Sequence, residues 1–118
     1  MRKTTSIGLL VAFLLAPLSA YAFEKIDTKD KFLSLVEGKT LRLTGIKVQV
    51  TPSGEITGRA FGRGVKGAWN WQNGYFCRSL YWGNRDLGQN CQEVRAEGSK
   101  VRFTSDRGEG QYAVLNIR

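Results

Sequence analysis

The chain contains no histidine and few of the other residues on which catalytic and metal sites are commonly built. Its 118 residues include two Cys, two Pro and one Met. Without imidazole, Ser-His and Cys-His catalysis are excluded, as are zinc sites that need a His ligand. The cysteines, Cys77 and Cys91, lack the C-x-x-C spacing of a redox-active pair. By contrast, 14 Gly and three Trp indicate a turn-rich β protein.

One cofactor-binding motif matches the sequence pattern but lacks the structural context that the motif needs. Gly62 to Gly67 read G-x-G-x-x-G, a pattern that in dinucleotide-binding folds follows a strand and opens a helix. Here it runs into Trp69-Asn70-Trp71, and aromatic residues oppose a helix. We therefore expect no nucleotide cofactor and no other cofactor. The glycines more simply bend a strand or let two backbones approach each other.

The first 22 residues have the order of a secretory signal peptide. Arg2 and Lys3 precede an apolar run from Ile7 to Leu15, and Ala20-Tyr21-Ala22 supplies a small-x-small cleavage pattern. The run is too short for a bilayer-spanning helix, which needs roughly 20 residues. A retained membrane anchor is the alternative. We expect cleavage before Phe23 and a mature protein, without a transmembrane segment, in the periplasm or outside the cell.

Export favours a disulfide, because an oxidising compartment joins the cysteines of a small domain. A Cys77–Cys91 bridge closes a loop near the 15-residue case, for which loop entropy gives about 3 kcal/mol. A redox-active pair is the alternative, and it requires two reactive thiols.

The expected mature domain, residues 23–118, is basic. Without Arg2 and Lys3, the 18 basic residues fall to 16 against 10 acidic residues, a net charge of +6. Such a charge favours anionic partners: acidic glycans, lipid head groups, nucleic acid or acidic proteins. The basic residues form no continuous run, so a plain solubilising surface is the alternative.

The hydrophobic pattern predicts one helix followed by strands. Asp27 or Thr28 can cap a helix whose apolar residues run from Phe32 to Val36 and which ends at Gly38. The period then changes to two, which predicts strands at 41–50 with a bulge at Gly45, 56–61, 65–71, 75–82, 91–95, 101–105 and 112–117, with a loop at 84–90. Seven or eight antiparallel strands in hairpin order make a small, mainly β up-and-down barrel or sandwich. The N-terminal helix should cover one end or edge.

Asn73-Gly74 is the strongest hairpin signal, and a two-residue turn there sets a register. Gln72 then faces Tyr75, and Trp69 faces Arg78. One face collects the apolar residues and is therefore the core face: Val65, Trp69, Trp71, Phe76, Leu80 and Trp82. Arg78 is the exception on this face. Its guanidinium either has a structural role, stacking on Trp69 and bonding carbonyls, or anchors an anion in a pocket.

The stretch from Gly67 to Gln92 contains G-x-W-x-W, G-Y-F-C-R, W-G and N-C-Q in that order. It resembles a group of small exported bacterial proteins that commonly carry the name dihydrodipicolinate reductase. The enzyme of that name has a Rossmann domain and a His-His…Lys motif, whereas this chain has no His and room for one domain. The residues therefore do not support a reductase. Gly67-Ala68-Trp69 is also similar to the G-x-W of lipocalins, which implies a barrel but no particular ligand.

Two classes of function remain. The preferred one is a non-enzymatic binding or interaction module for an anionic ligand or an envelope partner. Its partners would be an anionic glycan, a lipid or an acidic protein, because aromatic faces and guanidinium groups suit them. The candidate binding residues are Trp69, Arg78, Tyr75, Tyr81, Trp82, Arg59, Arg63 and Arg85.

The alternative is a small hydrolase that uses paired carboxylates. Its candidate acids lie in predicted turns or at strand ends, and no pair is identifiable by spacing. They are Asp86, Glu93, Asp106 and Glu109. A carboxylate pair about 5–9 Å apart in a cleft would favour this class.

Overall fold

The computed structural model describes residues 22–118, so the predicted signal peptide, apart from Ala22, lies outside the described residues. In chain order the elements are β1 (Glu24–Lys25), α2 (Lys29–Val36), β2 (Leu41–Leu43), β3 (Ile46–Val50), β4 (Glu55–Ala60), β5 (Arg63–Gln72), β6 (Tyr75–Trp82), β7 (Arg85–Glu97), β8 (Lys100–Thr104), α3 (Ser105–Gly108) and β9 (Tyr112–Ile117).

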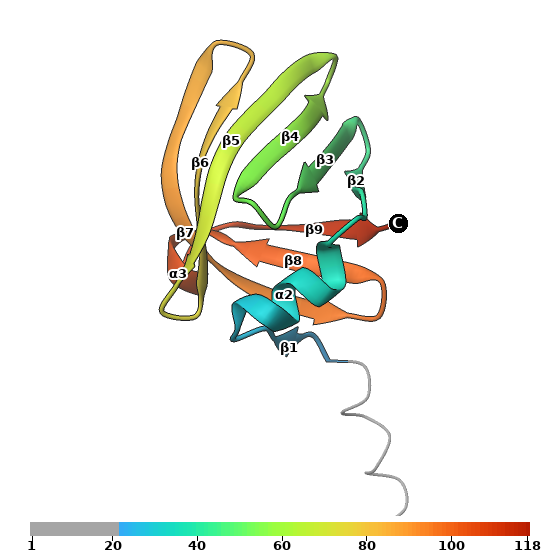
Figure 1. Cartoon of the computed structure of the whole chain (residues 1–118), viewed down its shortest axis with the longest axis vertical. Helices are drawn as coiled ribbons and strands as arrows, with labels where there is room; N and C mark the ends of the chain where they lie inside the picture. The colour runs from blue at the N-terminus through green and yellow to red at the C-terminus, as the bar shows by residue number, and fades with distance from the viewer. Residues whose placement is uncertain (1–21) are drawn as a thin grey trace, which may run out of the picture.

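Within these residues, eight antiparallel strands close into a barrel (Figure 1). Each strand from β2 to β9 pairs with the next one in the sequence, and β9 pairs with β2. Closure removes the free sheet edges, and it decides between the barrel and the sandwich that the sequence left open. The two-residue β1 pairs with β7 and precedes the helix. Among the described residues, the core and the residues packed against it lie between Ile26 and Ile117.

Helix α2 closes one end of the barrel (Figure 1). Thr28 caps it, accepting a hydrogen bond from the Lys31 backbone N–H at 3.2 Å. Phe32 is fully buried and packs against four aromatic rings at centroid distances of 5.2–6.2 Å: Trp69, Trp71, Phe76 and Phe103. Because these rings come from β5, β6 and β8, one side chain joins three strands at the closed end.

The β5–β6 hairpin has the register that the sequence predicts. Gln72 pairs with Tyr75 and Trp69 pairs with Arg78. Asn73 and Gly74 have φ of 51° and 85°, as a two-residue turn of this kind requires. The six apolar residues of the predicted core face all belong to the core or pack against it. Cys77 and Cys91 are paired on the neighbouring strands β6 and β7, which confirms the predicted disulfide.

Two predicted connections are wrong. Gly45 does not form a bulge; it lies with φ of 78° in a tight turn between β2 and β3, where Leu43 pairs with Ile46. Of the predicted loop at 84–90, Asn84 lies in the β6–β7 turn, but residues 85–90 belong to β7, which begins at Arg85. Asp86 and Gly88, which suggested a loop, lie where the pairing register of β6 and β7 is irregular. Asp86 accepts a hydrogen bond there from the Gly88 N–H at 2.8 Å.

Replacing both cysteines should destabilise the barrel without unfolding it. The bridge spans a sequence separation of 14 residues. For a loop near this length, the double variant C77S/C91S should lose about 3 kcal/mol of unfolding free energy. Urea denaturation measures this difference. Two reactive thiols in the non-reduced parent protein would instead contradict the bridge.

Arg95 links β7 to the N-terminal segment. Its guanidinium donates to both carboxylate oxygens of Glu93, at 3.0 and 3.3 Å, and to the Phe23 carbonyl at 3.5 Å. The hydrogen bonds from Arg95 hold the pKa of Glu93 below its ordinary value of 4.5, although partial burial opposes this shift.

This lowered pKa predicts a small acid-dependent contribution to stability. The contribution should be complete above the unfolded pKa of Glu93 and should disappear as the pH falls through the lower folded pKa. At pH 7 the E93Q variant should be less stable by at most about 1 kcal/mol, because the pair is solvent-accessible. The difference should shrink between about pH 5 and pH 3 in urea titrations. A difference that is constant over this range would contradict the ion pair.

Candidate functional site

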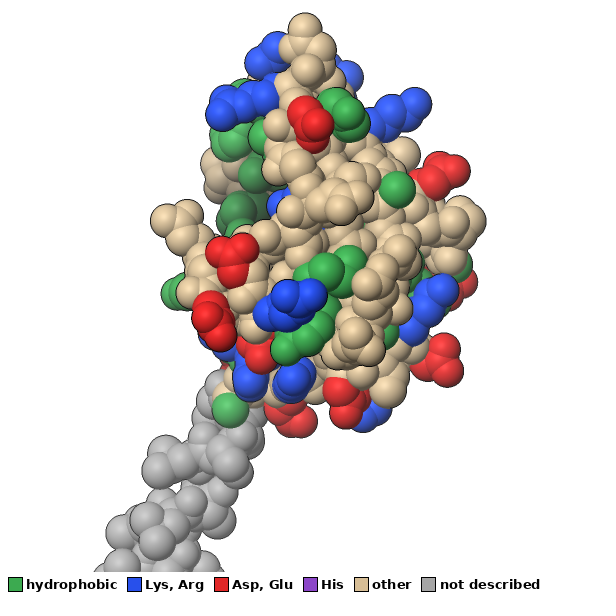
Figure 2. All heavy atoms as spheres, turned by 90° about the vertical axis from the view of Figure 1, so that its left-hand side faces the viewer, with side chains coloured by type: hydrophobic (Ala, Val, Ile, Leu, Met, Phe, Trp, Pro, Cys, Tyr) green, Lys and Arg blue, Asp and Glu red, His purple; other side chains and the backbone are tan. Residues whose placement is uncertain are grey.

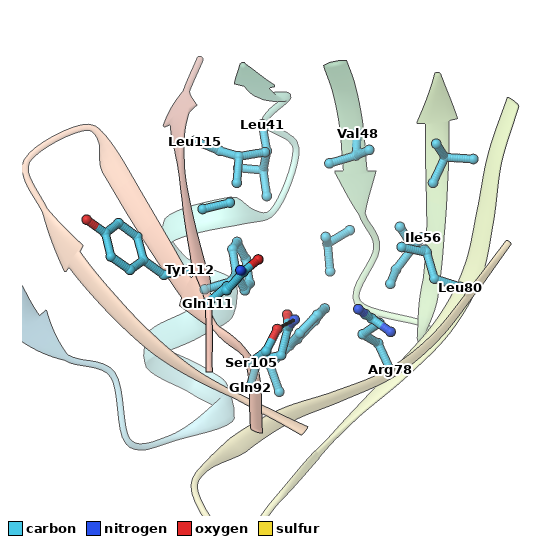
Figure 3. Close-up of a pocket in the computed structure, with 15 residues that line it drawn as sticks. Leu41, Val48, Ile56, Arg78, Leu80, Gln92, Ser105, Gln111, Tyr112 and Leu115 are labelled. Atoms are coloured by element: carbon cyan, nitrogen blue, oxygen red, sulfur yellow. Dashed lines mark hydrogen bonds between the residues drawn. The ribbon is translucent and has the colours of Figure 1, made fainter. Parts of the chain in front are cut away.

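The barrel encloses a cavity of about 350 Å³ that is open at one side (Figure 3). This volume is at the lower end of the usual range for small-molecule sites. Most of its wall is aliphatic and comes from six strands: Leu41, Val48, Val50, Ile56, Val65, Leu80 and Leu115. Four polar side chains interrupt this wall: Arg78, Gln92, Ser105 and Gln111. The cavity is therefore amphipathic.

Arg78 is the one charged residue among those that line the cavity. Alternation along β6 turns it inward, and Figure 3 shows its guanidinium directed into the space. Nη1 donates to the Gly88 carbonyl at 3.0 Å, and among the described residues Arg78 forms no ion pair. Burial lowers the pKa of Arg78, because few protein groups replace the solvation that its charge loses.

The polar part of the cavity is held by α3 and its neighbours. Gln92 donates to the Ser105 hydroxyl at 3.3 Å, and both lie on the same side of the cavity as Arg78 in Figure 3. Asp106 follows with a left-handed φ of 55°. Asn90 fixes this strained residue through two hydrogen bonds, to the Asp106 N–H at 2.9 Å and to its carboxylate at 2.8 Å.

The cavity continues toward the end of the barrel opposite α2. An adjoining apolar hollow of about 280 Å³ shares Val48, Val65 and Leu80 with it. This hollow reaches Phe61 and Leu87, beside the β4–β5 and β6–β7 turns. We call this end of the barrel, opposite α2, the open end.

The candidate binding residues do not form one site. Of the eight, Arg78 lines the cavity. Trp82 lies near the open end, where its indole N–H donates to the Ala60 carbonyl at 2.7 Å. The guanidinium of Arg63 lies 4.9 Å from the centre of the Trp82 ring. Three exposed candidates lie on the neighbouring outer surface of the barrel: Arg59, Tyr81 and Arg85.

Trp69 and Tyr75 lie toward the closed end. The ammonium of Lys29 is 5.6 Å from the Trp69 ring centre. The predicted stacking of Arg78 on Trp69 is not formed within the described residues, although the two face each other across the hairpin. Arg78 turns instead to a carbonyl of β7. Tyr75 is half-buried on the outer surface, with Lys25 at 5.7 Å from its ring centre.

The four candidate acids of the alternative hydrolase lie away from the cavity lining. Asp86 and Asp106 accept the hydrogen bonds described above, and Glu93 is paired with Arg95. Glu109 is exposed in the connection after α3. Within residues 22–118, no group of three or more His, Cys, Asp or Glu gathers in a way that could hold a metal ion.

Three polar residues of the cavity are absent from the candidates that the sequence provides. Gln92 is in phase with buried Val94, so alternation along this strand was the signal that could have found it. Ser105 is the first residue of α3, and Gln111 follows this element. No pattern in the sequence indicates the left-handed residues that bring these two side chains to the cavity.

No protein-family model, no curated protein and no solved structure matches this chain. Among the described residues, no helix has the length and apolarity needed to cross a membrane.

Arg78 should contribute little to stability in the ligand-free protein. R78M keeps an unbranched side chain of similar reach but removes the charge, whose burial is compensated by one hydrogen bond within the described residues. We expect the unfolding free energy from urea denaturation to change by less than about 1 kcal/mol. A loss of about 3 kcal/mol would show instead that Arg78 has a structural role.

Proposed function

We propose that this protein is a non-enzymatic binding module that takes a small amphipathic anion into the barrel. The observation that carries the proposal is Arg78, an inward-facing guanidinium without an acidic partner among the described residues, inside an aliphatic cavity. A carboxylate, sulfate or phosphate ester on Arg78 would supply the missing countercharge and accept two hydrogen bonds from its fork.

The other polar side chains support the same part of the ligand. Gln92 and Ser105 lie on the same side of the cavity as Arg78 and can hydrogen-bond an anionic head group (Figure 3). The aliphatic residues of the remaining wall suit an apolar body. At about 30 Å³ for each water-sized group, the cavity of about 350 Å³ suits a chain of roughly ten carbons with its head group.

The proposed setting is the periplasm or the exterior of the cell, after cleavage before Phe23. The signal-like order of residues 1–22 supports export, and the Cys77–Cys91 disulfide agrees with an oxidising compartment. A binding role is favoured over hydrolysis because the candidate carboxylates have partners or exposed positions outside the cavity.

Calorimetric titration with decanoate and decanol tests the proposal. These probes have the same chain length and differ in the charge of the head group. Decanoate should bind more tightly by about tenfold or more, because hydrogen bonds to a charged group contribute roughly 1.5–3 kcal/mol. The R78M variant should lose this preference while retaining its stability.

R118Q serves as the control, since it also removes one positive charge but at an exposed position. It should retain the preference for decanoate. Equal affinity of the parent protein for both probes, or an undiminished preference in R78M, would refute an anion anchor at Arg78.

A further inference from the structure

The outer surface at the open end has a row of basic side chains. Arg42 of β2 pairs with Lys47 of β3, and Lys47 pairs with Arg59 of β4, so the three lie side by side. All three are exposed, and none forms an ion pair within the described residues. Like charges directly opposite each other destabilise a sheet. The row therefore weakens the isolated barrel and favours an anionic partner.

Further basic residues extend this row around the same end. Arg63 and Arg85 begin β5 and β7, directly after the β4–β5 and β6–β7 turns, and both are exposed. In Figure 2 several basic side chains gather at the upper end of the molecule, where few acidic side chains are visible, whereas lower down basic and acidic side chains are mixed. We use the name basic rim for Arg42, Lys47, Arg59, Arg63 and Arg85.

Phe61 occupies the β4–β5 turn in a backbone conformation that suits it poorly. It is 66% exposed, and its φ is 50°. In the equivalent turn between β5 and β6, Asn73 has nearly the same φ, 51°, and each residue is followed by Gly. Such turns prefer Asn, Asp or Gly here, because a bulky side chain is strained at positive φ. Strain at an exposed aromatic residue that does not fill the core indicates a function for that residue.

Two aliphatic side chains are exposed at the same end. Leu43 directly precedes the β2–β3 turn and is 41% exposed, and Leu87 is 44% exposed and lines a hollow with Phe61. The other large hydrophobic residues that the described chain exposes are Tyr81 and Tyr112, which carry hydroxyl groups. We use the name apolar tip for Leu43, Phe61 and Leu87.

We propose that the apolar tip and the basic rim dock the open end of the barrel onto the surface of an anionic lipid bilayer. Apolar side chains can enter the boundary between head groups and acyl chains, and surrounding Lys and Arg are attracted by the negative surface potential. A bilayer is favoured over an acidic protein because the apolar residues lie at or near three separate turns and the basic rim comes from five strands, so apolar surface and charge are spread around the end of the barrel.

This docking surface goes beyond the proposed ligand site and does not depend on it. Arg78 lines the interior of the barrel, whereas the basic rim is exposed. Docking would place the opening of the cavity against the lipid. An R78M variant should therefore bind vesicles as the parent protein does, so the failure of one proposal leaves the other testable.

Vesicle co-sedimentation tests the docking surface. The chain should begin at Phe23, because the apolar run of residues 7–15 would bind vesicles by itself. We expect binding to phosphatidylcholine vesicles that contain phosphatidylglycerol, and little binding to phosphatidylcholine alone. Binding should be lost at 1 M salt, where electrostatic attraction is screened within about 3 Å.

The F61N variant separates docking from folding. Asn suits the turn, so the urea midpoint should be unchanged or higher. Vesicle affinity should fall by about tenfold or more, as expected when one large apolar side chain is no longer buried. Unchanged vesicle affinity in a folded F61N protein would overturn the role of the apolar tip.

Two charge-matched triple variants test the position of the basic rim. R42Q/K47Q/R59Q should lower the affinity for phosphatidylglycerol vesicles by roughly a hundredfold, at about fivefold for each basic residue. K31Q/K39Q/K100Q removes the same charge from exposed positions toward the closed end and should change the affinity by no more than about fivefold. Equal losses in both variants would show a general effect of net charge and would overturn the docking surface.

Polyglutamate serves as a probe for the other occupant. If the parent protein binds polyglutamate but does not bind phosphatidylglycerol vesicles, the basic rim recognises an acidic polypeptide and the bilayer proposal fails. Tight binding to vesicles, with little competition from polyglutamate, would support the bilayer.

Discussion

The two-residue turn at Asn73-Gly74 sets which side chains of the β5–β6 hairpin enter the barrel. Because side chains alternate along a strand, a shift by one residue would exchange the two faces. The observed register sends Trp69 and Phe76 into the core and Arg78 into the cavity. The same register leaves Cys77 on the opposite face, where it pairs with Cys91 of β7. The core, the disulfide and the charged cavity therefore depend on one turn.

Because α2 closes one end of the barrel, the side chains that this register turns inward lie in a cavity above a closed end. Phe32 packs among aromatic rings from three strands and seals the barrel below the cavity. The open end lies opposite α2. A guanidinium at the surface would be well solvated, but Arg78 is half-buried between aliphatic walls, where an anionic ligand gains more from it.

Local signals in the sequence were sufficient for the main architecture. Asn73-Gly74 predicted the hairpin, the alternation of the strands predicted the mainly β fold, and a cap at Asp27 or Thr28 predicted the helix. The expected export to an oxidising compartment predicted the disulfide. The sequence could not choose between barrel and sandwich, because that choice depends on the pairing of β9 with β2, which are far apart in the chain. It also misplaced 84–90, where Gly88 and neighbouring polar residues form an irregular strand rather than a loop.

The residues of the candidate site were predicted less completely than the fold, because several of them meet only through pairing between distant segments. Arg78 stood out because alternation placed a charge on an apolar face. The basic rim was only partly recognised, since Arg42 and Lys47 meet Arg59 through pairing between strands rather than through a run in the sequence. Ser105 reaches the cavity through the strained connection at α3, which has no local signature.

Several features that stabilise this barrel lie at its closed end or between β6 and β7, whereas two features that weaken it lie at its open end. The aromatic cluster around Phe32 and the capped helix lie at the closed end, while the Cys77–Cys91 bridge joins β6 and β7. The strained Phe61 and the row of like charges lie at the open end. The like charges repel one another, and the exposed Phe61 ring leaves apolar surface in water. An anionic partner would relieve the first and an apolar partner the second, so both features favour a binding function at the open end.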